Sequence, residues 1–146
     1  MANKRFFVGI LAMALVFGMA LVSCDDNTPS GVDRALNGTW VRGSNEVTFS
    51  NGNYVLKDSG GQLVKGPYTT NNGSMTITIT HVYGGNSKWG GLLQSTKWYT
   101  RTELKESAIG RFMTDGDLNE IFSSLTGSYS VSGNRLTMGT EVYTRK

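Results

Sequence analysis

The chain has 146 residues with a formal net charge of +3, and Lys4 and Arg5 supply two of those charges, which leaves +3 − 2 = +1 for the rest. The other basic residues are scattered, which argues against a nucleic-acid-binding surface. One cysteine and one histidine exclude the usual clustered zinc sites, and we expect no metal and no cofactor. Nineteen glycines against two prolines predict many tight turns.

A short apolar run begins the chain. Lys4 and Arg5 precede residues 6–22, which carry no charge, and this is the pattern of a secretory signal. The run is shorter than the about 20 apolar residues of a spanning helix. Asp25 and Asp26 follow it, where a stop-transfer segment would carry basic residues. We therefore expect cleavage rather than a membrane span.

The run ends in Leu21-Val22-Ser23-Cys24, which resembles the lipobox of bacterial lipoproteins. The resemblance implies that residues 1–23 are a signal peptide and that the Cys24 sulfur carries the lipid. The protein would then be a membrane-anchored lipoprotein of the cell envelope, at the outer membrane or the periplasmic face, with the membrane as its partner. The alternative is an ordinary secretory signal with a coincidental cysteine.

Residues 24–34 are polar and include Thr28-Pro29-Ser30-Gly31, the composition of a flexible tether. Residues 35–146 have a length suited to one domain with a single core. Short alternating segments follow, separated by turn signals such as Asn51-Gly52 and Asn71 to Ser74, as in an antiparallel meander. Pro67 suggests an edge, a bulge or a strand end. The expected strands begin at Gly38, Glu46, Asn53, Gln62, Met75, Gly127, Arg135 and Glu141.

Residues 84–91 are rich in glycine and predict a flexible loop. After it, Thr114 with an acid at Asp117 predicts a helix N-cap, and Leu118, Ile121, Phe122 and Leu125 continue at helical spacing. We expect an all-β fold, an antiparallel up-and-down β-barrel of about eight strands, with a short helical insertion between Thr102 and Leu125.

Gly38-Thr39-Trp40 at the first strand resembles the G-x-W motif of lipocalin-like (calycin-type) barrels. In that family a basic residue of the last strand packs over the tryptophan, and Arg145 would take this part. Several segments, among them Lys65-Gly66-Pro67-Tyr68 and Thr126-Gly127-Ser128-Tyr129, are similar to small lipocalin-like lipoproteins of spirochaete envelopes. These resemblances imply a fold and leave the ligand open.

Two groups of polar residues are candidates for a reactive site. His81 continues the apolar face of Met75, Ile77 and Ile79, and it is interpreted as a structural or surface histidine rather than a catalytic one. Asp115, Asp117 and Glu120 do not match the calcium-loop template, and helix capping explains them better. No nucleophile motif is recognisable, so we do not expect an enzyme.

Three functional interpretations remain open. The barrel binds a small apolar molecule, or it has a filled core and acts as a lipid-tethered protein-binding, structural or inhibitor module, or it is an envelope hydrolase. We expect the first, a non-enzymatic binding module. Its ligand would contact the inward side chains Trp40, Phe49, Tyr54, Tyr68, Ile77 and Ile79. Trp89, Trp98 and Tyr129 are further aromatic candidates.

Overall fold

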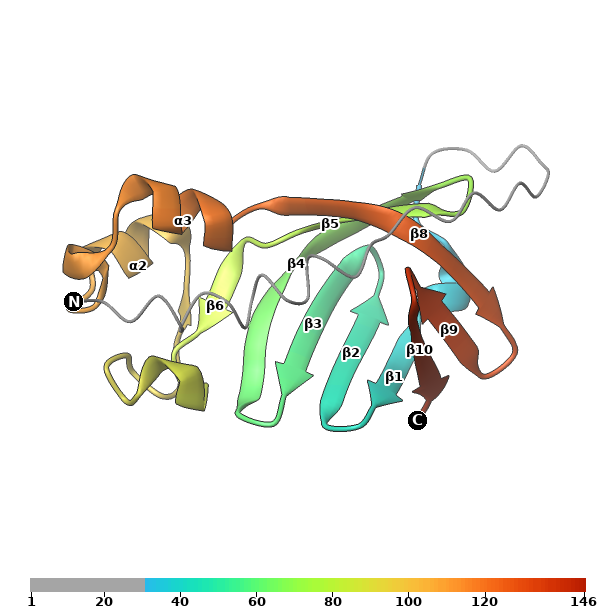
Figure 1. Cartoon of the computed structure of the whole chain (residues 1–146), viewed down its shortest axis with the longest axis horizontal. Coiled ribbons are helices and arrows are strands. Elements are labelled where there is room, and N and C mark those ends of the chain that lie inside the picture. Colours follow the sequence, from blue (N-terminus) through green and yellow to red (C-terminus); the bar gives the residue numbers. More distant parts are fainter. Residues whose placement is uncertain (1–30) are drawn as a thin grey trace.

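The computed structural model describes residues 31–146, so the expected signal peptide, Cys24 and the tether up to residue 30 lie outside the described residues. The described chain forms a closed antiparallel barrel of eight strands with two short helices (Figure 1), which confirms the predicted fold class. Its strands are β1 (Gly38–Arg42), β2 (Asn45–Ser50), β3 (Asn53–Asp58), β4 (Gly61–Asn71), β5 (Ser74–Thr78), β8 (Ser124–Ser132), β9 (Arg135–Met138) and β10 (Glu141–Arg145).

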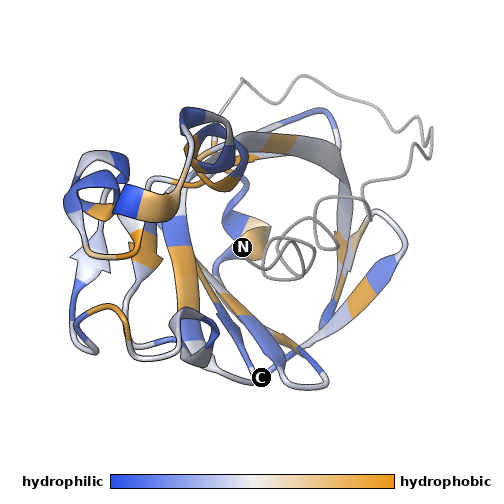
Figure 2. Ribbon diagram, turned by 60° about the vertical axis from the view of Figure 1, so that its left-hand side comes forward, coloured by the Kyte–Doolittle hydropathy of each residue, from blue (hydrophilic) through white to orange (hydrophobic). Residues whose placement is uncertain are grey.

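Consecutive strands pair as a meander, and two longer-range pairings complete the ring. β5 pairs with β8 across the insertion, and β10 pairs with β1, with Trp40 opposite Arg145. The β2–β3 turn has positive φ at Asn51 (48°) and Gly52 (81°), as the type I′ turn predicted for an Asn-Gly pair requires. Seen more nearly along its axis, the barrel encloses its interior as a ring of strands (Figure 2).

Pro67 lies within the longest strand rather than at a strand end. β4 pairs with β3 from Gly61 to Pro67 and with β5 from Tyr68 to Asn71. The edge of β4 opposite β3 pairs with His81 and Val82 at Lys65 and Val64 and with β5 only from Tyr68 on, so Pro67 lies in the gap between these two partners. A residue without an N–H is tolerated there because its side of the ladder needs no donor.

The strand after β5 is broken, and this break reverses which side chains point inward. β6 (His81–Tyr83) continues along β4 after β5 ends, and it pairs with β7 (Trp98–Tyr99). Ile79 and Val82 are both buried, whereas His81 between them is half-exposed. The expectation that His81 continues the apolar face is therefore wrong, because the irregular step between β5 and β6 shifts the alternation by one residue.

The insertion between β7 and β8 contains α2 (Arg101–Glu106), the 3-10 helix η3 (Gly110–Phe112) and α3 (Asp115–Ile121), at one end of the barrel (Figure 1). The predicted N-cap at Thr114 is confirmed: Thr114 and Asp117 form a capping box. Thr100 and Glu103 form a second one at α2. Both satisfy amides that have no partner within the helix.

The domain begins before residue 35. Gly31 forms backbone hydrogen bonds with Thr70, and the side chain of Asp33 caps the 3-10 helix η1 (Arg34–Leu36). Leu36 is fully buried, and its carbonyl accepts a hydrogen bond of 2.7 Å from Trp40 Nε1. Residues 31–34, which composition alone groups with the tether, are thus part of the folded barrel.

Candidate functional site

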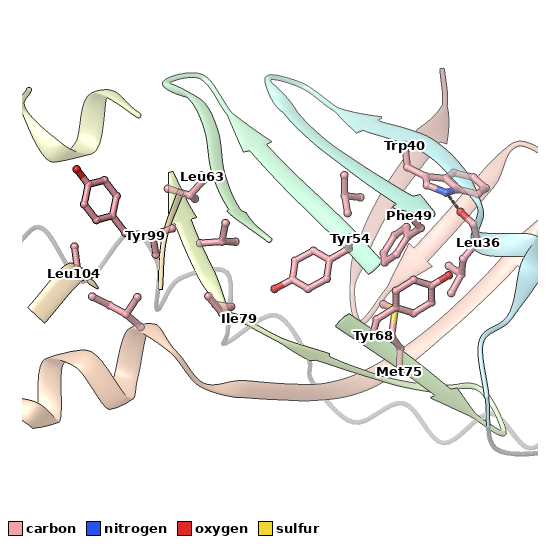
Figure 3. Packing of buried hydrophobic residues seen from close by; sticks show 14 of the residues in the cluster. Leu36, Trp40, Phe49, Tyr54, Leu63, Tyr68, Met75, Ile79, Tyr99 and Leu104 are labelled. Atoms are coloured by element: carbon pink, nitrogen blue, oxygen red, sulfur yellow. Dashed lines mark hydrogen bonds between the residues drawn. The ribbon is translucent and has the colours of Figure 1, made fainter. Parts of the chain in front are cut away.

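Five of the six side chains proposed to contact a ligand belong to the hydrophobic core cluster, and the sixth, Ile77, packs against it. Figure 3 shows Tyr68 near Phe49 and Met75, with Trp40 and Leu36 beside them. The Phe49 and Tyr68 rings meet edge to face, with their centroids 4.9 Å apart. The ring centroid of Tyr54 is 6.5 Å from that of Phe49. The two isoleucines differ, because Ile79 is buried whereas Ile77 is only partly buried against the cluster.

Leu36 and Met75 belong to the same cluster, although the sequence analysis did not name them as ligand contacts. Met75 lies on the alternating face of β5 that the sequence already marks as apolar. The only signal for Leu36 was an apolar residue just before the Gly-x-Trp motif. Its role depends on η1 folding back against Trp40, a contact that periodicity within a strand does not reveal.

Arg145 covers the Trp40 ring, as the resemblance to lipocalin-like barrels implies for the last strand. Its guanidinium carbon lies 4.1 Å from the ring centroid. Its N–H groups donate to the carbonyls of Asn37 (2.7 Å) and Ala35 (2.9 Å). Gly38 has φ +126°, and a Cβ there would approach Arg145 Nη1 to 2.7 Å. The Gly-x-Trp motif thus has a physical reason here, since only glycine allows this packing.

Tyr54 places a hydroxyl inside the barrel without a partner. The side chain is 2% exposed, and no atom of residues 31–146 forms a hydrogen bond with its hydroxyl. Burial raises the pKa of Tyr54 well above its ordinary value, so the group is a neutral phenol at physiological pH. Figure 3 shows the hydroxyl directed away from Phe49 and Leu36, toward the region of Leu63 and Ile79.

Tyr129 provides a contrast on the same barrel. Its hydroxyl donates to Asp33 Oδ2 at 2.9 Å, and burial together with this carboxylate raises the pKa of Tyr129 to about 12. A half-buried tyrosine of this fold therefore has a partner for its hydroxyl, whereas the more deeply buried Tyr54 has none among the described residues. The Tyr68 hydroxyl is likewise buried without a partner among the described residues, so Tyr54 and Tyr68 are two polar groups of the interior that are open to a ligand.

Charged side chains are kept out of the interior. Every Asp, Glu, Lys, Arg and His of residues 31–146 is at least partly exposed. The Asp58 side chain is only 7% exposed, and Lys88 pairs with its carboxylate at 2.7 Å near the β3–β4 turn. Alternation places Arg42 on the same face of β1 as Trp40, but its side chain is 46% exposed and pairs with Glu141, so no fully buried charged group among the described residues can meet an ionised ligand.

The glycine-rich segment is held against the barrel, unlike the flexible loop that its composition predicts. Asn86 is buried, and its amide donates to Asp58 Oδ1 and to the carbonyls of Gly61 and Gln62. The following 3-10 helix η2 (Ser87–Trp89) buries Trp89. Composition identified the turn residues but not the buried amide that fixes the segment.

His81 and Trp98 lie on the outer face of the barrel. The Lys65 Nζ lies 4.5 Å from the Trp98 ring centroid, and Tyr83 packs on the same ring at 4.9 Å. Thr80 is hydrogen-bonded to His81 Nδ1 at 2.9 Å, and burial, followed by the charge of Lys65, lowers the pKa of His81. The proposal that Trp98 lines the interior is therefore wrong, since it packs on Lys65 and Tyr83.

Among residues 31–146 no group of three or more His, Cys, Asp or Glu side chains is arranged to hold a metal ion. Within the same range, no helix is both long and apolar enough to cross a membrane. No protein-family profile, no curated protein and no solved structure matches the chain.

Proposed function

We propose that this protein is a lipid-anchored envelope protein whose barrel binds one small, mainly apolar molecule without chemical conversion. The observation that carries the proposal is the buried aromatic cluster with the unpartnered Tyr54 hydroxyl at its inner side. Binding sites of this kind are mostly apolar with a few placed polar groups. The Gly-x-Trp and Arg145 packing supports the likeness to lipocalin-like barrels.

Titration of the protein with a neutral fluorescent naphthylamine tests the binding site. Ile77 is a partly buried side chain of β5 that packs against the core cluster. Thr76, on the opposite face of the same strand, forms a hydrogen bond with the hydroxyl of Thr126 on the outside of the barrel. We expect saturable binding that Ile77→Asp abolishes and that Thr76→Asp leaves unchanged. Ile77→Trp, which removes interior space without adding charge, should also weaken binding. Absence of saturable binding to the wild-type protein would refute the proposal.

The anchor is supported by the apolar run that ends in Leu21-Val22-Ser23-Cys24. Expression of the full-length chain in bacteria with labelled palmitate should label the wild-type protein. Cys24→Ala should take up no label and should keep its first 23 residues, because lipid addition precedes cleavage. Cleavage of the Cys24→Ala chain at the same position would indicate an ordinary secretory signal instead.

Protein binding is the second candidate, and exposed apolar residues near the helical insertion favour it. Phe112 is 80% exposed in η3, and Leu92 is 61% exposed in the segment after η2. An isolated exposed apolar residue is common on protein surfaces. The interior cluster is therefore the better supported site. If every interior variant still bound the naphthylamine, the result would favour this second candidate.

A further inference from the structure

We infer that the molecule bound in the barrel is uncharged and presents a hydrogen-bonding oxygen, such as a carbonyl or ester group, to the hydroxyl of Tyr54. The inference rests on the proposed binding function and narrows its ligand class. The inferred site would bind neutral apolar molecules in preference to ionised amphiphiles, such as fatty-acid anions, that carry the same hydrocarbon chain.

The first step concerns the hydroxyl itself. A buried hydroxyl without a partner is less favourable than one that is hydrogen-bonded, because it has lost its bonds to water. Tyr54 is 2% exposed, and no described residue offers it a partner. The hydroxyl points away from Phe49 and toward the region of Leu63 and Ile79 (Figure 3). The missing hydrogen-bond partner would therefore lie on this inner side of the cluster. An oxygen of a bound molecule at this position would remove that cost.

The second step concerns charge. No Lys, Arg or His among residues 31–146 is fully buried. Arg42, which strand alternation places on the same face of β1 as Trp40, is already paired with Glu141, so it is not a free cation for a carboxylate. Arg145 packs on Trp40, but its guanidinium is already held by the carbonyls of Ala35 and Asn37 at the η1 end. Lys65 lies on the outer face over Trp98.

These two steps give a selective site. Burying an ionised carboxylate without a partner is far less favourable than burying an ester or ketone that accepts one hydrogen bond. The neutral Tyr54 phenol can donate that one bond but cannot balance a charge. We therefore expect the barrel to prefer the neutral member of any pair of ligands with the same hydrocarbon chain.

Three ligands with one hydrocarbon chain test this: dodecanoate, its methyl ester and dodecane. They are compared on the full-length chain in the same detergent, by displacement of the neutral naphthylamine, at a pH where the free acid is ionised. We expect the ester to bind on the order of 100-fold more tightly than the anion. Tyr54→Phe should weaken ester binding roughly 3- to 10-fold and leave dodecane binding unchanged.

Tyr83→Phe is the matched control, because it removes the same hydroxyl group from the outer face, where Tyr83 packs on Trp98. It should bind all three ligands as the wild type does. Equal binding of anion and ester would overturn the inference and leave the proposed binding function standing. Ester binding that is unchanged in Tyr54→Phe would also overturn the inference. If the naphthylamine itself does not bind, the proposed function fails first.

Discussion

At the scale of single residues, the Tyr54 hydroxyl makes a prediction about stability that is independent of any ligand. Because the group is buried without a partner among the described residues, its removal should relieve a desolvation cost. Tyr54→Phe should therefore raise the free energy of unfolding of the ligand-free protein by about 1 kcal/mol. Urea denaturation measures this change. A lower stability of the variant would indicate that a hydrogen bond to the hydroxyl exists in solution.

Arg145 gives the second prediction at this scale. Its contact with Trp40 and its two bonds to backbone carbonyls would all be lost in Arg145→Ala. We expect the free energy of unfolding to fall by about 2 kcal/mol. This is toward the lower end for such interactions, because the Arg145 side chain is only half-buried. Arg145→Lys keeps the charge but not the planar fork, and should recover only part of the loss. Urea midpoints measure both variants. Arg135→Ala, at an exposed position of the neighbouring strand, should change the midpoint little.

Single residues also show where sequence reasoning succeeded. The contact of Trp40 with Arg145 was implied by the resemblance of Gly38-Thr39-Trp40 to the motif of lipocalin-like barrels, and it is present at 4.1 Å. The unpartnered state of the Tyr54 hydroxyl was not predictable. It depends on where side chains from other strands end, and no local pattern of residues reports that distance.

At the scale of secondary-structure elements, the capping box of α2 makes stability depend on pH. The Glu103 carboxylate accepts hydrogen bonds from the backbone N–H and side-chain hydroxyl of Thr100 and pairs with Lys97. The Thr100 amide foremost, then Lys97, lowers the pKa of Glu103 from 4.5 to about 2. Because the folded-state pKa is the lower one, this stabilisation is complete above pH 4.5 and is lost as the pH falls toward 2.

Glu103→Gln tests this linkage. The variant should be less stable than the wild type at neutral pH, and the difference in urea midpoint should shrink as the pH falls from 4.5 toward 2. Glu106→Gln is the control, since Glu106 is on the same helix but outside the capping box. A difference between Glu103→Gln and wild type that stays constant down to pH 2 would contradict the assignment.

Elements with strong local signals were predicted well, and those set by neighbouring strands were not. The Asn51-Gly52 turn and the Thr114 N-cap were both correct, because each depends on a few adjacent residues. The break between β5 and β6 was missed. It arises where β4 is shared by two strands in succession, and it moves His81 to the outer face. Alternation read along one strand assumes a regular partner, which is the condition that fails here.

At the scale of the whole molecule, the structure predicts where the folded domain must begin. A chain that begins at Asn37 lacks the buried Leu36, the carbonyl that binds Trp40, and the Asp33 carboxylate that accepts from Tyr129. Burial of a leucine contributes about 1.5–3 kcal/mol and each hydrogen bond about 1 kcal/mol. We expect the shorter chain to be about 4 kcal/mol less stable than one that begins at Gly31. Equal urea midpoints for the two chains would contradict this boundary.

Pairing of the first and last strands also sets a limit on when the protein can fold. Thr144 lies opposite Val41, and the Lys146 amide donates to the carbonyl of Thr39 at 2.9 Å, so the barrel closes through β10. Contacts between such distant positions in the sequence slow folding, because a long loop must be ordered before they form. The ring is therefore incomplete until β10 has been synthesised. The proposed export would benefit from this order, since an unclosed barrel can still pass through a translocation channel as an extended polypeptide.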